Sequence, residues 1–268
     1  MIKNNGQDKQ LYYQKKIAPF QANIKELLKK EGVILAECRA DPVTAAPKLF
    51  FLAERMLDIM SNYLMLNGIA QTTLGAKDET ALSEARRSVS KAIIYLENIV
   101  TGKVDAPFSE YEAGLTELDS INLEQRYNIA RKLGLSVSLL KAAYGNNSKW
   151  RWVFVDMDGH CAAVVKNLLD LKKAQANNDP ASPDYETLLY HVRFVKKMLN
   201  DAAERLHSRY MLATKRNEDI RQAGNFLSAL QRIYIIFNEN DEADMTKRKY
   251  DRWISTLEAD MKKAAEQK

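Results

Sequence analysis

The stretch VFVDMDGHC, residues 153–161, decides the fold, because its letters suit either a buried β-strand or an α-helix. Three apolar residues precede Asp-x-Asp-Gly, a pattern typical of a strand that ends at an active site. On a helix, at about 100° per residue, the same stretch instead belongs to one apolar stripe. The residues within about ±40° of one line are Trp150, Val153, Met157, Cys161, Val164, Leu168 and Leu171. The stripe runs through DMDG without a break and favours a helix.

The same stretch resembles the first motif of the haloacid-dehalogenase phosphatases, in which the first Asp attacks phosphorus and the second handles the leaving-group proton. In that family the motif ends a strand, so both carboxylates point the same way and reach one Mg²⁺. On a helix, Asp156 and Asp158 diverge by about 200° and could not share a metal ion. His160 stands where the family has Thr or Val, and no alternation of strands and helices follows. We therefore predict that DMDG is not catalytic and that the protein is not an enzyme.

Helical spacing of apolar residues extends over almost the whole chain, which has only six Pro and ten Gly. The interruptions fall near residues 41–42, 68–78, 101–120, 145–149 and 177–184, where Gly, Pro, Asn and Asp gather. Between them, apolar residues recur at steps of three and four. The sequence predicts an all-α fold, a multi-helix bundle of about eight helices with no significant β-sheet.

Residues 101–120 contain Gly, Pro and acidic residues and are the best candidate for a connecting segment. They would separate an N-terminal helical lobe, residues 1–100, from a C-terminal lobe, residues 121–268, unless both form a single compact domain. Residues 1–120 carry 15 Lys+Arg and 16 Asp+Glu, whereas residues 121–268 carry 25 and 19. The C-terminal lobe is therefore basic, which permits an acidic partner. We expect residues 1–8 to be disordered.

Composition excludes several classes of protein. The chain of 268 residues is 46% hydrophobic and has two cysteines, Cys38 and Cys161, too few for a disulfide framework or a Cys-rich metal site. The N-terminus lacks the apolar core of a signal peptide. The most hydrophobic run, residues 49–70, is broken by Glu54, Arg55 and Asp58. We therefore expect a cytoplasmic protein with no membrane partner.

One pair has the spacing of a metal site. Glu204 and His207 form the Glu-x-x-His pattern used by carboxylate-bridged di-iron bundles. No second such pair exists, and on the helical wheel both residues lie far from the apolar stripe, which predicts that they face solvent. His191 lies about 160° from His207 and cannot converge with it on one ion. The sequence predicts no catalytic, cofactor-binding or metal-ligating residue and no cofactor.

Residues 126–145, RYNIARKLGLSVSLLKAAYG, are similar to the helix-turn-helix of phage repressors and many bacterial transcription factors. Residues 133–135 take the place of the turn, with Gly134 in it. The resemblance implies a second helix that enters the major groove of DNA. It implies that the residues in contact with nucleic acid are Ser136, Ser138, Lys141, Lys149 and Arg151. Val137 and Ala142 would also face DNA. Asn146 and Asn147 would lie near phosphates.

An ordinary bundle helix accounts for the same letters. The stripe that starts at Leu123 and ends at Tyr144 passes through Gly134 uninterrupted. Among the residues placed at the groove, only Lys141 is a strong base-reading side chain. Both alternatives stay open at the level of sequence.

These observations favour a non-enzymatic cytoplasmic helical scaffold or adaptor that binds a protein partner, with self-association as a further option. The apolar surface of residues 49–66 and the heptad-like steps of residues 82–99 and 220–237 could each receive a partner helix. The alternative is a DNA- or RNA-binding protein that uses residues 126–145.

Overall fold

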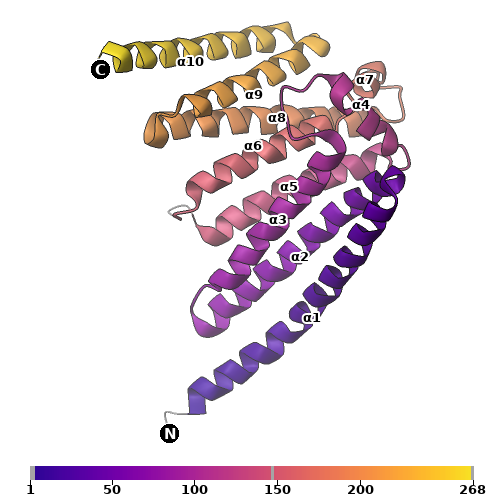
Figure 1. Cartoon of the computed structure of the whole chain (residues 1–268), viewed down its shortest axis with the longest axis vertical. Helices are drawn as coiled ribbons and strands as arrows, with labels where there is room; N and C mark the ends of the chain where they lie inside the picture. The colour runs from indigo at the N-terminus through magenta and orange to yellow at the C-terminus, as the bar shows by residue number, and fades with distance from the viewer. Residues whose placement is uncertain (1–3, 146–147, 267–268) are drawn as a thin grey trace. The chain divides into compact units, whose positions relative to one another are not determined.

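The structure, a computed structural model, describes residues 4–145 and 148–266 (Figure 1). Within these ranges the chain is helical and has no β-strand, so the all-α prediction is confirmed. The ten α-helices of this part are α1 (Asn4–Ala40), α2 (Ala45–Leu74), α3 (Glu79–Val100), α4 (Phe108–Glu117), α5 (Leu123–Tyr144), α6 (Arg151–Asn167), α7 (Leu171–Ala176), α8 (Tyr185–Arg209), α9 (Asn217–Ile236) and α10 (Asn240–Glu266). A 3₁₀-helix (Pro42–Thr44) precedes α2, and a π-helix (Tyr210–Thr214) follows α8.

The two helices beyond the predicted eight are short. α4 has 10 residues and lies inside the segment that we predicted as a connection, and α7 has 6 residues. Both are shorter than the windows over which apolar periodicity can be recognised. None of the described helices combines the length and the apolar character that crossing a bilayer requires.

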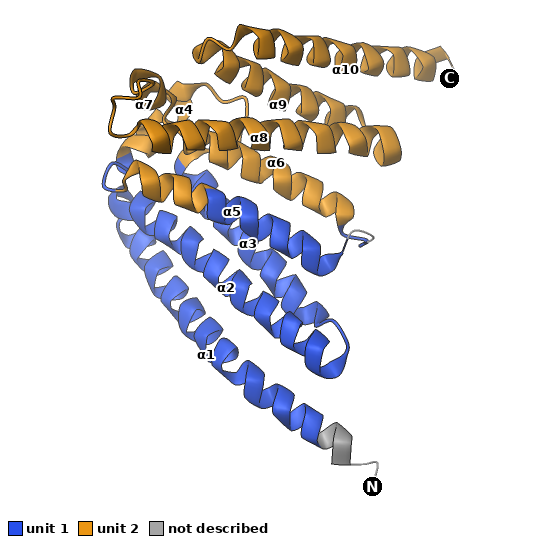
Figure 2. Cartoon of the chain, turned by 180° about the vertical axis from the view of Figure 1, so that it is seen from behind, with its two compact units in different colours: residues 1–99, 117–120, 131–150 blue, residues 100–116, 121–130, 151–268 orange. Residues whose placement is uncertain are grey.

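The chain divides into two compact units, coloured separately in Figure 2. Unit 1 contains residues 1–99, 117–120 and 131–150, and unit 2 contains residues 100–116, 121–130 and 151–268. The division passes through α5, whose first turns belong to unit 2 and whose remainder belongs to unit 1. Of residues 1–8, which we expect to be disordered, 1–3 lie outside the described residues and α1 begins at Asn4.

Unit 1 joins α1, α2, α3 and most of α5 through an apolar core with a few polar contacts in it and at its edge. Glu31 of α1 is 5% exposed and accepts hydrogen bonds from Tyr95 and from Lys91 Nζ of α3, the latter at 2.9 Å. Burial, together with the Glu31 carboxylate, raises the pKa of Tyr95. Lys132 of α5 pairs with Asp58 of α2 at 2.8 Å. These contacts fix which helix faces meet.

Unit 2 contains a row in which α6 packs on α8, α8 on α9, and α9 on α10, with the short α7 between α6 and α8 in the sequence (Figure 2). The loop formed by residues 101–106 is fastened to the last turn of α6. Asn167 Nδ2 donates to the carbonyls of Thr101 (2.9 Å) and Lys103 (3.1 Å), and Lys166 Nζ donates to that of Ala106 (3.3 Å). Burial, with a smaller effect of Arg232, lowers the pKa of Lys166 to about 8.

Two helical glycines in unit 2 lie against neighbouring helices. A Cβ atom on Gly224 of α9 would stand 2.9 Å from Cε2 of Tyr250 in α10, closer than real packing allows. A Cβ atom on Gly159 of α6 would stand 3.4 Å from the Phe226 ring, an ordinary contact. Only Gly224 is therefore required for the approach of its two helices.

His191 is a core histidine of α8. It is 3% exposed, its ring centroid lies 5.5 Å from that of Tyr127, and it hydrogen-bonds to the Val165 backbone. Burial lowers its pKa to about 4. The side chain is therefore neutral at physiological pH.

The two glycines give opposite predictions for substitution by alanine. Alanine favours a helix by about 1 kcal/mol over glycine, but in Gly224→Ala the displaced Tyr250 ring costs about 1–3 kcal/mol. We expect Gly224→Ala to lower the free energy of unfolding. Gly159→Ala, the matched control, should raise it by up to about 1 kcal/mol. Urea unfolding measures both, and shifts of the same sign would contradict the packing difference.

His191 predicts acid sensitivity. In the unfolded chain its pKa is about 6.5, and in the folded chain about 4. The unfolded state therefore takes up a proton first, and stability falls as pH drops from about 6.5 to about 4, by roughly 3 kcal/mol in total. Urea unfolding between pH 7 and pH 4.5 should show a shallower loss in His191→Gln than in the wild type. The surface variant His160→Gln should keep the full loss, and equal slopes in all three proteins would contradict the assignment.

Candidate functional site

The DMDG motif lies in the interior of α6, so the predicted helix through it is confirmed. Asp156 and Asp158 point to different sides, with side chains 56% and 11% exposed. Asp158 Oδ2 lies 2.7 Å from Nη1 of Arg205, and Asp156 Oδ1 lies 2.7 Å from Nη1 of Arg209. Because each carboxylate binds an arginine of α8, one turn apart, the motif joins two helices. It does not form the paired carboxylates of a phosphatase.

Arg209 is the centre of the polar interior of unit 2. Its side chain is 4% exposed, and Nη1 also donates to the carbonyl of Trp152 at 3.2 Å. Nη2 donates to Oδ1 of Asp219 in α9 at 2.7 Å, and Asp219 is itself 2% exposed. The hydroxyl of Thr214 donates to the other oxygen of Asp219. One guanidinium therefore ties α6, α8 and α9 together.

The π-helix after α8 carries the chain from this cluster to α10. Its end is marked by Lys215, a non-glycine residue with φ of 50°, in the left-handed region. The hydroxyl of Tyr210 donates to Oδ2 of Asp260 at 2.7 Å, and Lys215 Nζ lies 3.2 Å from the same oxygen. The π-helix and the residue that follows it thus present two hydrogen-bond donors to one carboxylate of α10.

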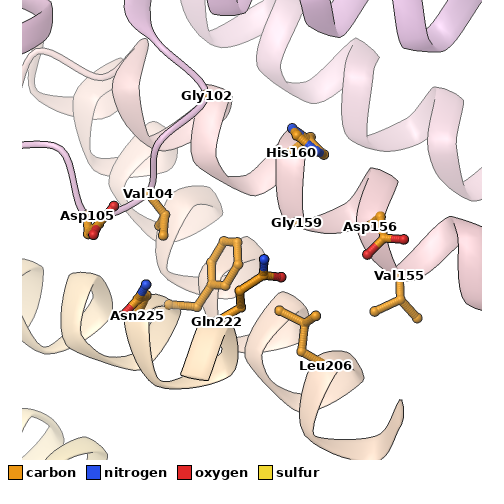
Figure 3. Close-up of a pocket in the computed structure, with 11 residues that line it drawn as sticks. Gly102, Val104, Asp105, Val155, Asp156, Gly159, His160, Leu206, Gln222 and Asn225 are labelled. Carbon is orange, nitrogen blue, oxygen red and sulfur yellow. The ribbon is translucent and has the colours of Figure 1, made fainter. Parts of the chain in front are cut away.

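A cleft of about 250 Å³ opens beside the DMDG motif (Figure 3). We call it the α6 cleft. Its walls come from the 101–106 loop, α6, α8 and α9. The buried residues of its floor are Val104, Val155, Gly159, Leu206 and Phe226. The exposed polar residues of its rim are Asp105, Asp156, His160, Gln222 and Asn225. Its lining contains no lysine or arginine.

Of the Glu-x-x-His pair, Glu204 faces solvent, as we predicted, with its side chain 48% exposed, whereas His207 does not and packs on α10 instead. Glu204 forms an ion pair with Lys249, and His207 stacks on Trp253 with ring centroids 4.1 Å apart and planes 6° apart. A wheel drawn from one apolar stripe overlooks a second packing partner, which is the physical reason for the error. Among the residues that the structure describes, no group of three or more His, Cys, Asp or Glu could hold a metal ion.

The turn that the helix-turn-helix resemblance implies at residues 133–135 is absent, because α5 continues through Gly134 without interruption. Ser138 Oγ donates to the Gly134 carbonyl at 3.0 Å, as in an ordinary helix. A glycine in a helix costs only about 1 kcal/mol, less than the burial of the apolar stripe that continues on both sides of it. Ser136 is 4% exposed and so does not face a ligand.

The remaining residues of the predicted nucleic-acid set are not gathered within one unit. Ser138, Lys141 and Lys149 belong to unit 1, whereas Arg151 belongs to unit 2. Lys149 Nζ lies 5.6 Å from the centroid of the Trp150 ring, and Arg151 stacks over Trp152 at 4.7 Å. Asn146 and Asn147 lie outside the described residues.

Sequence reasoning missed the Arg209 cluster and the α6 cleft. In the sequence, a buried Arg–Asp pair cannot be distinguished from a surface pair. The one available signal is the spacing of Arg205 and Arg209, which lie one helical turn apart. The cleft needs the 101–106 loop beside α6, a contact between segments about 50 residues apart in the chain. No pattern of neighbouring residues in the sequence predicts a contact between segments so far apart.

The cluster predicts unequal effects for its two arginines. Arg209→Met leaves the Asp219 carboxylate buried without its partner, and we expect a loss of about 3–5 kcal/mol in the free energy of unfolding. Arg205→Met removes a partner whose side chain is 46% exposed, and we expect a loss below about 1 kcal/mol. Chemical unfolding measures both. Adding Asp219→Asn to Arg209→Met should recover part of the loss, and equal losses in the two single variants would contradict the central role of Arg209.

Comparisons with known proteins place the chain in a family. The model of the TP0443 family matches residues 9–261, which is nearly the whole chain. No curated protein and no solved structure matches it. The family match indicates common ancestry and does not indicate an activity. On the extent of the match, the chain belongs to the TP0443 family.

Proposed function

We propose that the protein is a non-enzymatic helical scaffold or adaptor that binds a protein partner through one end of unit 2. The observation that carries this proposal is a set of exposed apolar side chains on the elements that form an open groove. Met211 and Leu212, in the π-helix, are 43% and 73% exposed, and Met261 of α10 is 43% exposed. Large apolar side chains gathered at one place on a surface are typical of protein interaction sites.

The groove gives this surface its shape. It has a volume of about 520 Å³, and we call it the terminal groove. Its lining residues come from the π-helix, the start of α9 and the end of α10: Tyr210, Lys215, Asn217, Asp260, Met261, Lys263, Ala264 and Ala265. Methionine adapts its shape to different partners, which suits a docking surface. Leu212, two residues after Tyr210 in the π-helix, is an exposed apolar side chain that a partner could cover.

Charge favours a partner segment that carries acidic residues. Asp260 is engaged by Tyr210 and Lys215, so it offers little net negative charge to a ligand. Lys263 lies on the exposed side of α10, and residues 121–268 hold 25 basic against 19 acidic residues. We infer an amphipathic segment whose apolar face covers Leu212 and Met261 and whose acidic residues meet Lys263.

The candidate chemical residues of the chain serve the fold, which also favours a non-enzymatic role. Asp156 and Asp158 bind arginines, Glu204 binds Lys249, and His207 stacks on Trp253. Side chains held in helix–helix contacts are poorly placed to move protons or bind reacting groups. A nucleic-acid partner receives less support, because its proposed turn is a continuous helix.

The test uses Leu212→Glu, which places a charge on the exposed apolar group. Quantitative affinity purification from the native cell should retain a specific protein on the wild-type chain and at least tenfold less of it on Leu212→Glu, since a charge opposite an apolar contact weakens binding by more than about 1.4 kcal/mol. Met245→Glu, at a residue 68% exposed near the start of α10, is the matched control and should retain the partner.

Two outcomes would contradict the proposal. Equal retention by all three baits would show that the terminal groove is not the docking surface. Binding of duplex DNA at 50 mM salt that weakens steeply at 200 mM, measured by fluorescence anisotropy, would favour the nucleic-acid alternative. Light scattering at two protein concentrations distinguishes a foreign partner from self-association.

A further inference from the structure

The α6 cleft has a distribution of polar groups unlike that of a surface docking site. Asp105, on the 101–106 loop, and Asp156, on α6, stand at opposite sides of it in Figure 3, with Gln222 and Asn225 of α9 between them. The floor beneath is apolar and includes Val155, already buried in the folded chain. The cleft therefore offers two carboxylates, with amide groups and an apolar floor between them.

Both carboxylates keep acceptor capacity. Asp156 uses Oδ1 for Arg209, and within the described residues Oδ2 has no hydrogen bond. Within the same part of the chain, Asp105 has neither a hydrogen bond nor an ion pair. An ionised carboxylate only accepts hydrogen bonds, so a matching ligand must donate them.

Two cations behind the cleft offset part of its negative charge, because Arg209 binds Asp156 and the charge of Asp105 acts on Lys166, but neither cation lines the cleft. The guanidinium of Arg209 is 4% exposed and lies among Asp156, Asp219 and the Trp152 carbonyl. Lys166 is 4% exposed and directed to the Ala106 carbonyl. No cationic side chain reaches the lining itself, so the cleft does not offer an anion the direct contacts that it needs.

We propose that the α6 cleft binds a short aliphatic diamine, with one ammonium group at Asp105, the other at Asp156, and the methylene chain on the apolar floor. A volume of about 250 Å³ corresponds to roughly eight water molecules at about 30 Å³ each. This suits a ligand of six to eight non-hydrogen atoms. The inference is independent of the terminal groove, with which the α6 cleft shares no lining residue.

The test compares three probes of similar length on the full chain at pH 7 and low salt. Isothermal titration with 1,4-diaminobutane should give a Kd of about 1 mM or tighter. 1-Aminobutane, which lacks the second charge, should bind at least tenfold more weakly, and 1,4-butanediol, which lacks both, should not bind measurably. Equal affinities for the diamine and the diol, or no binding of the diamine, would overturn the proposal.

Variants then locate the site. In Asp105→Asn the diamine should bind no more tightly than the monoamine, because one of its two carboxylate partners is gone. Asp251→Asn, at an exposed acidic residue of α10 outside the cleft, is the matched control and should leave the difference between the two amines unchanged. Equal weakening in both variants would show general attraction to acidic residues and would overturn the site.

Gly159→Ala separates binding from folding. The added methyl group narrows the floor next to Phe226, where it makes an ordinary contact. We expect it to weaken diamine binding at least threefold while the midpoint of thermal unfolding stays the same or rises. Unchanged diamine affinity in this variant would place the ligand elsewhere and overturn the proposal.

Discussion

The interior of unit 2 depends on one buried cation. Arg209 is surrounded by a carboxylate from α6, a carboxylate from α9 and a carbonyl of α6. A charge with 4% exposure needs partners at the right positions, and both terminal nitrogens of Arg209 have them, whereas its buried Nε has no hydrogen-bond partner within the described residues. Three helices must therefore arrive together. The π-helix and the start of α9 together bring Asp219 back to the end of α8, where the hydroxyl of Thr214 donates to its second carboxylate oxygen.

The helical fold could be predicted because its evidence is local. The stripe through DMDG and the stripe through Gly134 each depend on side chains within one helix, and both helices are continuous. In both cases a short resemblance to a known motif predicted one structure, and the helical spacing of apolar residues over a longer stretch predicted another. The continuous helix is found in both because the free energy gained by burying many apolar residues exceeds the free-energy cost of one glycine in a helix.

The site could not be predicted in the same way, because its contacts join distant segments. Asp219 resembles any acidic residue in the first turn of a helix, yet it is 2% exposed and bound to Arg209. Glu204 and His207 lie opposite the main stripe of α8 but contact α10. A helical wheel describes one interface, whereas α8 packs on several neighbours. The α6 cleft requires in addition a loop held by Asn167 and Lys166.

The row of helices in unit 2 also bears on how the chain folds. Because α8, α9 and α10 pack on one another in chain order, and only the short α7 separates α6 from α8 in the sequence, native contacts close short loops. A low mean sequence separation of contacts is associated with fast folding. Each helix pair can form as soon as its second member has left the ribosome, and the row can grow from the N-terminal side during synthesis. α10 joins last, has no later helix in the described chain to cover it, and is where we expect amide hydrogen exchange to begin.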